Sequence, residues 1–475
     1  MRAKIFLFSI VAFACSLLQS SSASANGRFP DAQQLAFAPK GGDPNLVVLR
    51  TTFGIVLSRD AGKSWSWICE KALGFTGEWD PPIAVTKDGR LWVGLPDGLR
   101  STTGGCDTTE IPALKGARIT DLAVDASGEN VLVTSSPIEG PGKVAVVHSA
   151  KGDAVDVIGS TPPKMHLATA DFAPSSGKIY VSGKPFQSSE KRRGHLYVAA
   201  HGKPLAEVTT NLPDEDGIFI SAIDPKNDAH LVVRTLAPGG SDIAISDDGG
   251  KTFVKTFHSP TLLYGFAKSE DGKTLVVGSG DPNDGVTVSK DGGKTWTPSS
   301  KTSVRCLGMV GSTLYACSTP YRPDGFAVAS STDLGTTFTA LNTFAEIAGP
   351  VECDAGEGAA CASLWPAQKQ ALALQKSREE GGDVDAGSIA APVDAGSIAA
   401  PVDAGSSSVK ISAKSSCGCR EVGARAGDEG GFGLLLLFGV LLVRMDRRRS
   451  IFEPSMDHAP ASARVGRDPS RRSES

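Results

Sequence analysis

Ser289-Lys290-Asp291-Gly292-Gly293-Lys294-Thr295-Trp296 is one of four copies of an eight-residue pattern in this chain. The other copies share the form S-x-D-x-G-x-[ST]-[WF] and are Ser58-Arg59-Asp60-Ala61-Gly62-Lys63-Ser64-Trp65, Ser246-Asp247-Asp248-Gly249-Gly250-Lys251-Thr252-Phe253 and Ser331-Thr332-Asp333-Leu334-Gly335-Thr336-Thr337-Phe338. In a tight turn Asp accepts backbone N–H bonds, and Gly adopts positive φ without steric cost. The final aromatic residue begins the next strand, where we expect its ring to be buried between neighbouring sheets.

The spacing of the copies predicts the number of repeat units. The serines at 246, 289 and 331 are 43 and 42 residues apart, and a similar step from Ser58 reaches a weaker turn at Ser101. Two more weak turns, at Ser149 and Ala200, fill the gap before Ser246. Two short strand-like runs precede every turn, so the sequence predicts an all-β fold, a β-propeller of seven four-stranded blades. Six or eight blades remain alternatives, and a β-sandwich fits the regular period less well.

The repeated pattern resembles the Asp-box, or BNR repeat, of sialidase-like β-propellers. The resemblance implies that the boxes are structural elements at the blade periphery, so none of their aspartates is expected to be catalytic. A sialidase would also need an arginine triad and a Tyr–Glu pair. No spacing selects such a set among the candidates, which are Arg28, Arg50, Arg234, Arg305, Tyr180, Tyr264 and Tyr315.

The N-terminus has the three parts of a secretory signal peptide. Arg2 and Lys4 precede an apolar run from 5 to 18, and Ala23-Ser24-Ala25 forms an A-x-A cleavage site. The expected mature chain therefore begins at Asn26, after a signal peptide of residues 1–25. A lipoprotein signal at Cys15 and a buried N-terminal helix are the alternatives.

Export changes the interpretation of the cysteines, because disulfides form in oxidising compartments. Six of the nine cysteines lie in the globular part: Cys69, Cys106, Cys306, Cys317, Cys353 and Cys361. Proximity in sequence predicts the pairs Cys306–Cys317 and Cys353–Cys361, and the equivalent turns of adjacent blades suggest Cys69–Cys106. No Cys or His cluster has zinc spacing, so we predict no metal and no cofactor.

The composition changes after the repeats. The propeller is expected over 26–345, followed by a disulfide loop and a helix that closes against it over 346–380. A nine-residue repeat that begins at Val384 is small and polar, which predicts a disordered linker over 381–416.

The end of the chain combines Cys417-Gly418-Cys419 with an apolar span at 430–443 and an arginine cluster that ends at Arg449. This combination resembles the MYXO-CTERM sorting domain of myxobacterial surface proteins. It implies that a C-terminal sorting protease recognises residues 417–449 and that the protein is held at the cell surface or outer envelope, membrane-associated through this tail. Residues 450–475 extend beyond the usual end of such tails, and an ordinary anchor helix is the alternative.

Composition narrows the functional classes. The net charge of −4 gives no basic face for nucleic acid. Residues 280–285 have a calcium-like spacing of Asp and Asn, but the segment is better explained as an Asx/Gly turn. The favoured function is a non-catalytic module that binds a protein or a glycan. The alternatives are a sialidase-type glycoside hydrolase and an envelope or photosystem-assembly-like folding factor. The loops at 137–142 and 184–193 are the expected ligand site, at one end of the ring around its central channel.

Overall fold

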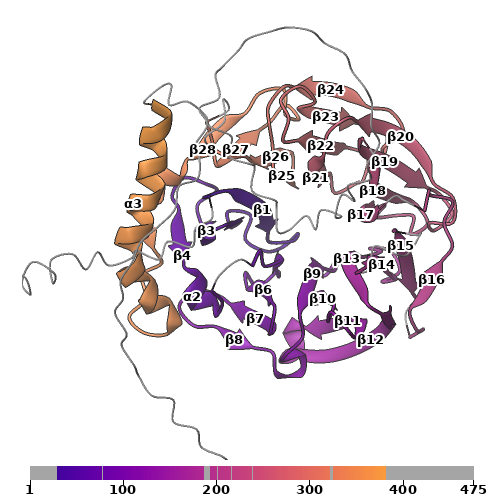
Figure 1. Ribbon diagram of the computed structural model, residues 1–475, viewed down its shortest axis with the longest axis horizontal. Helices are drawn as coiled ribbons and strands as arrows, with labels where there is room; N and C mark the ends of the chain where they lie inside the picture. The colour runs from indigo at the N-terminus through magenta and orange to yellow at the C-terminus, as the bar shows by residue number, and fades with distance from the viewer. Residues whose placement is uncertain are drawn as a thin grey trace, which may run out of the picture. The chain divides into compact units, whose positions relative to one another are not determined.

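The computed structural model describes residues 29–380 except 77–78, 187–192, 201, 215–216, 238 and 321–324. Within these ranges the chain forms a ring of seven antiparallel sheets around a central axis (Figure 1). The predicted seven-bladed propeller is therefore confirmed. The predictions for residues 1–25, Asn26, Arg28, the linker 381–416, the tail 417–449 with Cys417 and Cys419, and residues 450–475 all lie outside the described residues.

The blades follow one another in the sequence, and each runs from an inner strand at the axis to an outer strand at the edge. The first three blades are β1 (Ala32–Phe37), β2 (Val47–Thr51), β3 (Gly54–Ser58), β4 (Ser66–Ile68); β5 (Ile83–Val85), β6 (Leu91–Leu95), β7 (Gly98–Thr102), β8 (Thr109–Glu110); and β9 (Ile119–Val124), β10 (Asn130–Ser135), β11 (Pro141–His148), β12 (Ala154–Pro163).

The other four blades have the same order of strands. They are β13 (Met165–Phe172), β14 (Ile179–Pro185), β15 (His195–Ala199), β16 (Ala206–Val208); β17 (Gly217–Ile223), β18 (Leu231–Ala237), β19 (Gly240–Ser246), β20 (Val254–Ser259); β21 (Leu263–Lys268), β22 (Leu275–Ser279), β23 (Val286–Ser289), β24 (Thr297–Ser300); and β25 (Cys306–Val310), β26 (Thr313–Cys317), β27 (Val328–Ser331), β28 (Thr339–Asn342).

Burial explains why the middle strands are the most apolar. All five residues of β22 are buried, and so are all four of β23, because neighbouring blades cover both faces of the sheet. The outer strand β24 has only exposed or half-buried residues. A strand covered on both faces favours a continuous apolar run over alternation. The ring core is therefore the set of packed blade-to-blade contacts.

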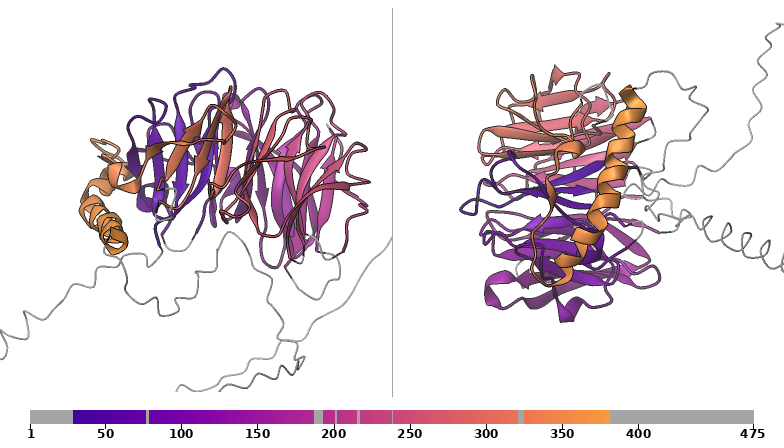
Figure 2. Two further views of the ribbon diagram at one scale, coloured as in Figure 1. Left: turned by 90° about the horizontal axis from the view of Figure 1, so that it is seen from above. Right: turned by 90° about the vertical axis from the view of Figure 1, so that its left-hand side faces the viewer.

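Residues 343–380, here called the strap, return to the first blade after the ring is complete. The strap contains the short strand β29 (Gly349–Pro350), which pairs in parallel with β4, and the helix α3 (Ala360–Glu380). Figure 2 shows α3 crossing the outer edge of the ring beside blade 1. Trp365 of α3 lies 5.5 Å from Trp67 of β4, centroid to centroid, and Leu372 is buried. Among the helices in the described ranges, none combines the length and the apolar character needed to cross a membrane.

The disulfides correct two of the sequence predictions. Cys306 is bonded to Cys317 as expected, since the two residues face each other across β25 and β26. Cys353 and Cys361 are not bonded to each other, and neither are Cys69 and Cys106. Cys361 is bonded to Cys69, and Cys353 to Cys106. Proximity in sequence gave the wrong pairs because the strap carries its two cysteines back to blades 1 and 2.

The ring closes between blade 7 and blade 1 through side chains. Arg305, just before β25, donates to Asp31 Oδ2 from Nη2 at 2.7 Å and from Nε at 3.2 Å. Thr319 Oγ1 donates to the other carboxylate oxygen of Asp31 at 2.7 Å. The Phe37 ring lies 5.1 Å from the Tyr315 ring, so an apolar contact lies beside the ion pair.

Candidate functional site

The four repeated turns share one hydrogen-bond pattern, in which the aspartate holds the turn closed. Each turn joins the third strand of its blade to the fourth. In blade 6, Asp291 Oδ1 accepts from Lys294 N and Thr295 N at 3.0 and 2.9 Å, and Oδ2 accepts from Thr295 Oγ1 at 2.6 Å. Ser289 Oγ donates to the same carboxylate and accepts from Gly293 N, both at 2.8 Å. Asp60, Asp248 and Asp333 accept the corresponding bonds from the hydroxyl and amide at the seventh position.

These bonds stabilise the ionised carboxylate. Hydrogen bonds from the Thr295 side chain and backbone lower the pKa of Asp291 to about 2, and equivalent bonds lower the pKa of Asp248 and Asp333 to about 2. The pKa of Asp60 is also lowered, first by the Ser64 hydroxyl. Every donor to one of these carboxylates belongs to the same turn as the carboxylate, so these hydrogen bonds stabilise the turn.

The change Asp291→Ala is expected to lower the free energy of unfolding by about 1–2 kcal/mol, because two backbone N–H groups and two hydroxyls lose their acceptor. Ligand binding is expected to be unaffected. Denaturant titration beside a binding assay measures both. Lys290→Ala, at the neighbouring exposed position of the same turn, is the matched control. Loss of binding at unchanged stability would assign the box a functional role.

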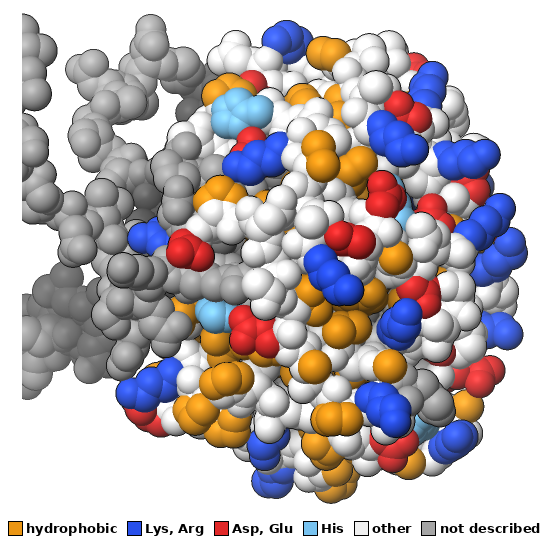
Figure 3. Space-filling view, turned by 90° about the vertical axis from the view of Figure 1, so that its right-hand side faces the viewer, with side chains coloured by type: hydrophobic (Ala, Val, Ile, Leu, Met, Phe, Trp, Pro, Cys, Tyr) orange, Lys and Arg blue, Asp and Glu red, His pale blue; other side chains and the backbone are white. Residues whose placement is uncertain are grey.

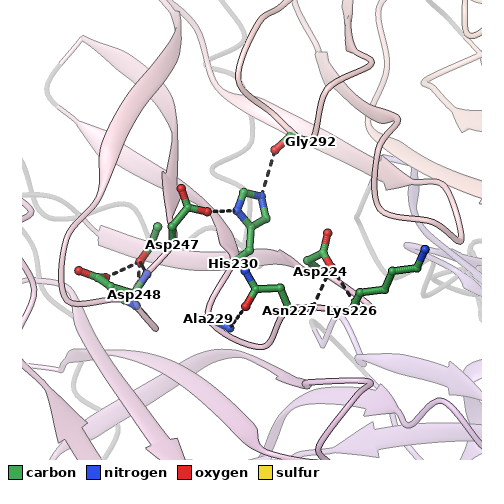
Figure 4. Close-up of polar contacts among 10 residues, drawn as sticks. Asp224, Lys226, Asn227, Ala229, His230, Asp247, Asp248 and Gly292 are labelled. Atoms are coloured by element: carbon green, nitrogen blue, oxygen red, sulfur yellow. Dashed lines mark hydrogen bonds and ion pairs between the residues drawn. The ribbon is translucent and has the colours of Figure 1, made fainter.

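The aromatic residue that ends each box lies against the preceding blade. Trp65 and Phe253 are buried. Trp296 Nε1 donates to Gly293 O of its own box at 3.0 Å and to Thr256 Oγ1 of blade 5 at 3.2 Å. His230 of blade 5 adds a polar link, with Nδ1 2.6 Å from Asp247 Oδ1 and Nε2 3.2 Å from Gly292 O of blade 6 (Figure 4). Each box therefore also joins two blades.

Blades 2, 3 and 4 lack a complete box, and the strand register shows what replaces it. In blades 1, 5 and 6 the box serines pair with the first residue of the second strand, as in Leu231↔Ser246 and Leu275↔Ser289. In blades 2, 3 and 4 this register position holds Thr102, His148 and Ala199, each one residue from the positions Ser101, Ser149 and Ala200 that spacing predicts. Variation in turn length caused the difference.

Blade 4 also lacks the aromatic residue. Trp296 directly precedes Thr297, which pairs with Val288, the residue before the box serine. By the same register, Ala206 pairs with Val198 in blade 4, so Leu205 occupies the aromatic position. Leu205 is half-buried and lies close to Gly159 of blade 3. A leucine fills less of the space between two blades than an indole does.

A groove of about 730 Å³ lies between blades 3 and 4, here called the blade 3–4 groove. Phe172, Pro174, Ile179 and Ala199 form its apolar side, on blade 4. Figure 3 shows the outer edge of the ring on the side of β16, where hydrophobic side chains gather between charged ones. The groove combines ligand-sized space with an apolar surface, as small-molecule and peptide sites do.

The blade 3 side of the groove carries a polar network beside Val146, Val157 and Ile158. Asn130 Nδ2 donates to Asp125 Oδ2 at 2.7 Å, which leaves Asn130 Oδ1 as an acceptor for the His148 ring at 2.6 Å. The other ring nitrogen of His148 lies 2.8 Å from Asp156 Oδ2. This wall presents carboxylate oxygens to a ligand, so it favours a ligand with hydrogen-bond donors.

The groove lies in the blades that the sequence favoured but at their other end. The loops at 137–142 and 184–193 join second strands to third strands. The groove is lined by the turns at 125–130, 173–177 and 200–204, which join first strands to second and third strands to fourth. Because the strands are antiparallel, these two sets of connections lie at opposite ends of the blades.

A second groove, of about 500 Å³, lies at the other end, between blades 6 and 7. Its lining includes Tyr264, Asp281 and Arg305. The Arg305 guanidinium lies 4.8 Å from the Tyr264 ring centroid and is paired with Asp31. Asp281 belongs to the segment with calcium-like spacing, and its Oδ1 accepts from Asn283 N at 2.9 Å, as in the Asx turn that the sequence favoured. In the described ranges no three His, Cys, Asp or Glu side chains come together to hold a metal ion.

No family model and no curated protein matches this chain. Solved structures similar to it include YCF48 from Cyanidioschyzon merolae, at 14% identity over 60% of this chain and 92% of that chain, with a TM-score of 0.41. Kuenenia stuttgartiensis hydrazine synthase is 12% identical over 68% of this chain and 99% of that chain, with a TM-score of 0.45. The Niastella koreensis GH74 enzyme is 15% identical, with a TM-score of 0.34. The matched region covers 68% of this chain and 58% of the enzyme's chain, so this chain spans less than two thirds of the enzyme's length. The similarity concerns the fold alone.

The arginines considered for a sialidase triad do not converge. Arg50 donates to the carbonyl oxygens of Asp80 and Pro81, Arg234 donates to Leu263 O, and Arg305 pairs with Asp31. Each arginine thus joins its own blade to the next one. Tyr180 donates to Asp228 O at the box end, and Tyr315 packs on Phe37. Arg305 stacks on one of these tyrosines, Tyr264, at 4.8 Å from its ring centroid, whereas Arg234 stacks on Phe219.

Sequence reasoning missed Asp121, which ties two inner strands together at the channel. Its Oδ2 accepts from Ala170 N of blade 4 at 2.8 Å. Burial raises the pKa of Asp121 to about 7. Thr169 accepts from Ile220 N in the next blade at 2.7 Å, so different residue types make equivalent links. No motif marks these positions, because the link needs only one acceptor at the right register.

Proposed function

We propose that this chain is an exported, surface-tethered β-propeller that binds a protein or glycan ligand without catalysing a reaction on it. The blade 3–4 groove carries the proposal. It is the larger of the two grooves described above, and it lies where blade 4 has Ala199 and Leu205 in place of a box serine and aromatic residue. The larger groove therefore lies beside a blade whose repeated turn is incomplete.

Export and tethering are supported by separate features of the chain. The N-terminal segment resembles a signal peptide, and the tail resembles a MYXO-CTERM sorting domain. The three disulfides suit an oxidising compartment. We further propose that the four repeated turns are Asp-boxes of the BNR type, whose bonds within the turn support a structural role.

The sialidase alternative rests on Tyr264, which lines a groove and stacks against Arg305. Its chemistry needs a carboxylate that activates the tyrosine and a triad for the substrate carboxylate. The lining of this groove holds no glutamate, and Arg305 is already paired with Asp31. These contacts support ring closure better than catalysis.

The test combines a glycan array with a fluorogenic sialoside assay on the full-length protein. We expect no turnover, and we expect any glycan bound on the array to be lost in Ala200→Trp, which places an indole in the blade 3–4 groove. Lys290→Trp, at the same turn position in blade 6, is the control. If the protein hydrolyses the sialoside and Tyr264→Phe abolishes this turnover, the enzymatic function is correct and the non-catalytic binding function is wrong.

A further inference from the structure

The outer strand of blade 3 differs from the outer strands of the other blades. β12 has ten residues, whereas the others have between two and six. An outer strand keeps a row of backbone N–H and C=O groups without strand partners, and natural proteins usually shorten or cover such edges. β12 also exposes Val157, whose exposed fraction is 72%. It is therefore a long, open edge with an apolar side chain on its surface.

Blade 1 shows how this scaffold uses an outer edge. The strap adds β29 to β4, and Ala348 N and Val351 N donate to Trp65 O and Trp67 O at 3.0 and 2.9 Å. Ile347 of the same segment is buried, and so is Phe344 of the short 3-10 helix η3 (Phe344–Glu346) that precedes it. An extended segment with a buried isoleucine thus occupies one blade edge, and no described residue plays this part at β12.

The blade 3–4 groove adjoins β12, because Asp156, Val157 and Ile158 of this strand line it. In blade 5 and blade 6 the aromatic position of the box holds Phe253 and Trp296, whereas in blade 4 it holds Leu205, next to Pro204 of the groove lining. A large apolar side chain beside β12 would therefore have room next to Phe172 and Ile179. Two carboxylates, Asp125 and Asp156, and one ammonium, Lys203, line the groove, so it favours a neutral or basic ligand over an acidic one.

We propose that β12 and the blade 3–4 groove bind an extended segment of a partner protein. The segment pairs with β12 and inserts an aromatic side chain into the groove. Main-chain pairing supplies affinity and the pocket supplies specificity, as in other cases of strand addition. This inference rests on the proposed function and deepens it by naming the ligand as a polypeptide.

The experiment pans a random heptapeptide display library on the full-length protein and measures the enriched peptide, labelled with fluorescein, by anisotropy. Val157→Lys places a charge on the edge, and Ala200→Trp fills the groove. We expect each change to weaken binding by about tenfold or more, and replacement of the peptide's aromatic residue by alanine to do the same. The matched controls are Val254→Lys, at an exposed valine of the outer strand β20, and Lys290→Trp; both are expected to stay within about twofold of wild type.

The outcomes separate this inference from the proposed function. Thermal melts first establish that the four variants are folded. The peptide site would be overturned if the enriched peptide bound the Val157→Lys and Ala200→Trp proteins as tightly as the wild-type protein. A library that yields no enriched peptide would overturn it as well. Glycan binding that Ala200→Trp abolishes, together with no enriched peptide, would keep the binding function and assign the groove to a sugar. An enriched peptide that is sensitive to Val157→Lys and Ala200→Trp but not to their controls supports the proposal.

Discussion

Replacing Cys69 and Cys361 by serine is expected to lower the free energy of unfolding by about 4–5 kcal/mol. The bond between them closes a loop of 292 residues, so it removes much of the conformational freedom of the unfolded chain. It also fastens the start of α3 to the end of blade 1, where Trp365 and Leu372 are packed. Loss of the bond therefore raises the conformational entropy of the unfolded chain and removes the covalent attachment of the strap to blade 1.

Denaturant titration of the oxidised proteins measures this effect. The control is the pair Cys306→Ser and Cys317→Ser, whose bond spans 11 residues and joins facing positions of one hairpin. The shorter loop predicts a loss of about 2–3 kcal/mol. An equal or larger loss in the control would contradict the role given to the strap. Peptide mapping without reduction tests the pairing itself, and a cross-link between Cys69 and Cys106 would show that the described bonds are wrong.

The change Asp31→Ala is expected to cost about 3 kcal/mol, because it leaves the largely buried Arg305 guanidinium without its carboxylate. The same carboxylate accepts from Thr319 Oγ1, so a second donor of blade 7 loses its partner. These contacts lie where blade 7 meets blade 1, which no shared sheet joins. The effect should therefore appear as earlier opening of the ring at this junction.

Hydrogen exchange of β1 and β25, together with denaturant titration, measures the effect of Asp31→Ala. The double change Asp31→Ala with Arg305→Met should recover part of the stability, since no unpaired charge is then buried. Glu270→Ala, which removes the exposed ion pair with Lys40, is the control and is expected to leave stability nearly unchanged. A loss in Asp31→Ala no larger than in Glu270→Ala would show that the ion pair does not close the ring.

Much of the fold could be predicted from local sequence. The boxes predict turns because Ser289, Asp291 and Gly293 act within eight residues, and the bonds that they form are local. Their spacing gives the number of blades, since each blade is contiguous in the chain. The Cys306–Cys317 bond was predictable for the same reason, because the two residues face each other within one hairpin.

The candidate site was less predictable, because it depends on contacts between blades. The sequence indicated the blades with weak boxes, but the strand register was needed to find that Leu205 stands at the aromatic position. The end of the blades at which the groove lies also depends on which connections of blades 3 and 4 come together. Neither feature has a signal within a short window of residues.

The sequence by itself determined the repeated turn, the seven units and the order of strands, since these follow from interactions between residues close together in the chain. Only the tertiary structure decided the course of the strap, the bonds of Cys69 with Cys361 and of Cys106 with Cys353, and the ion pair of Asp31 with Arg305. These contacts join residues separated by 247 to 292 positions. A ring brings such distant positions together only when its last blade meets its first, so their proximity is a property of the closed fold.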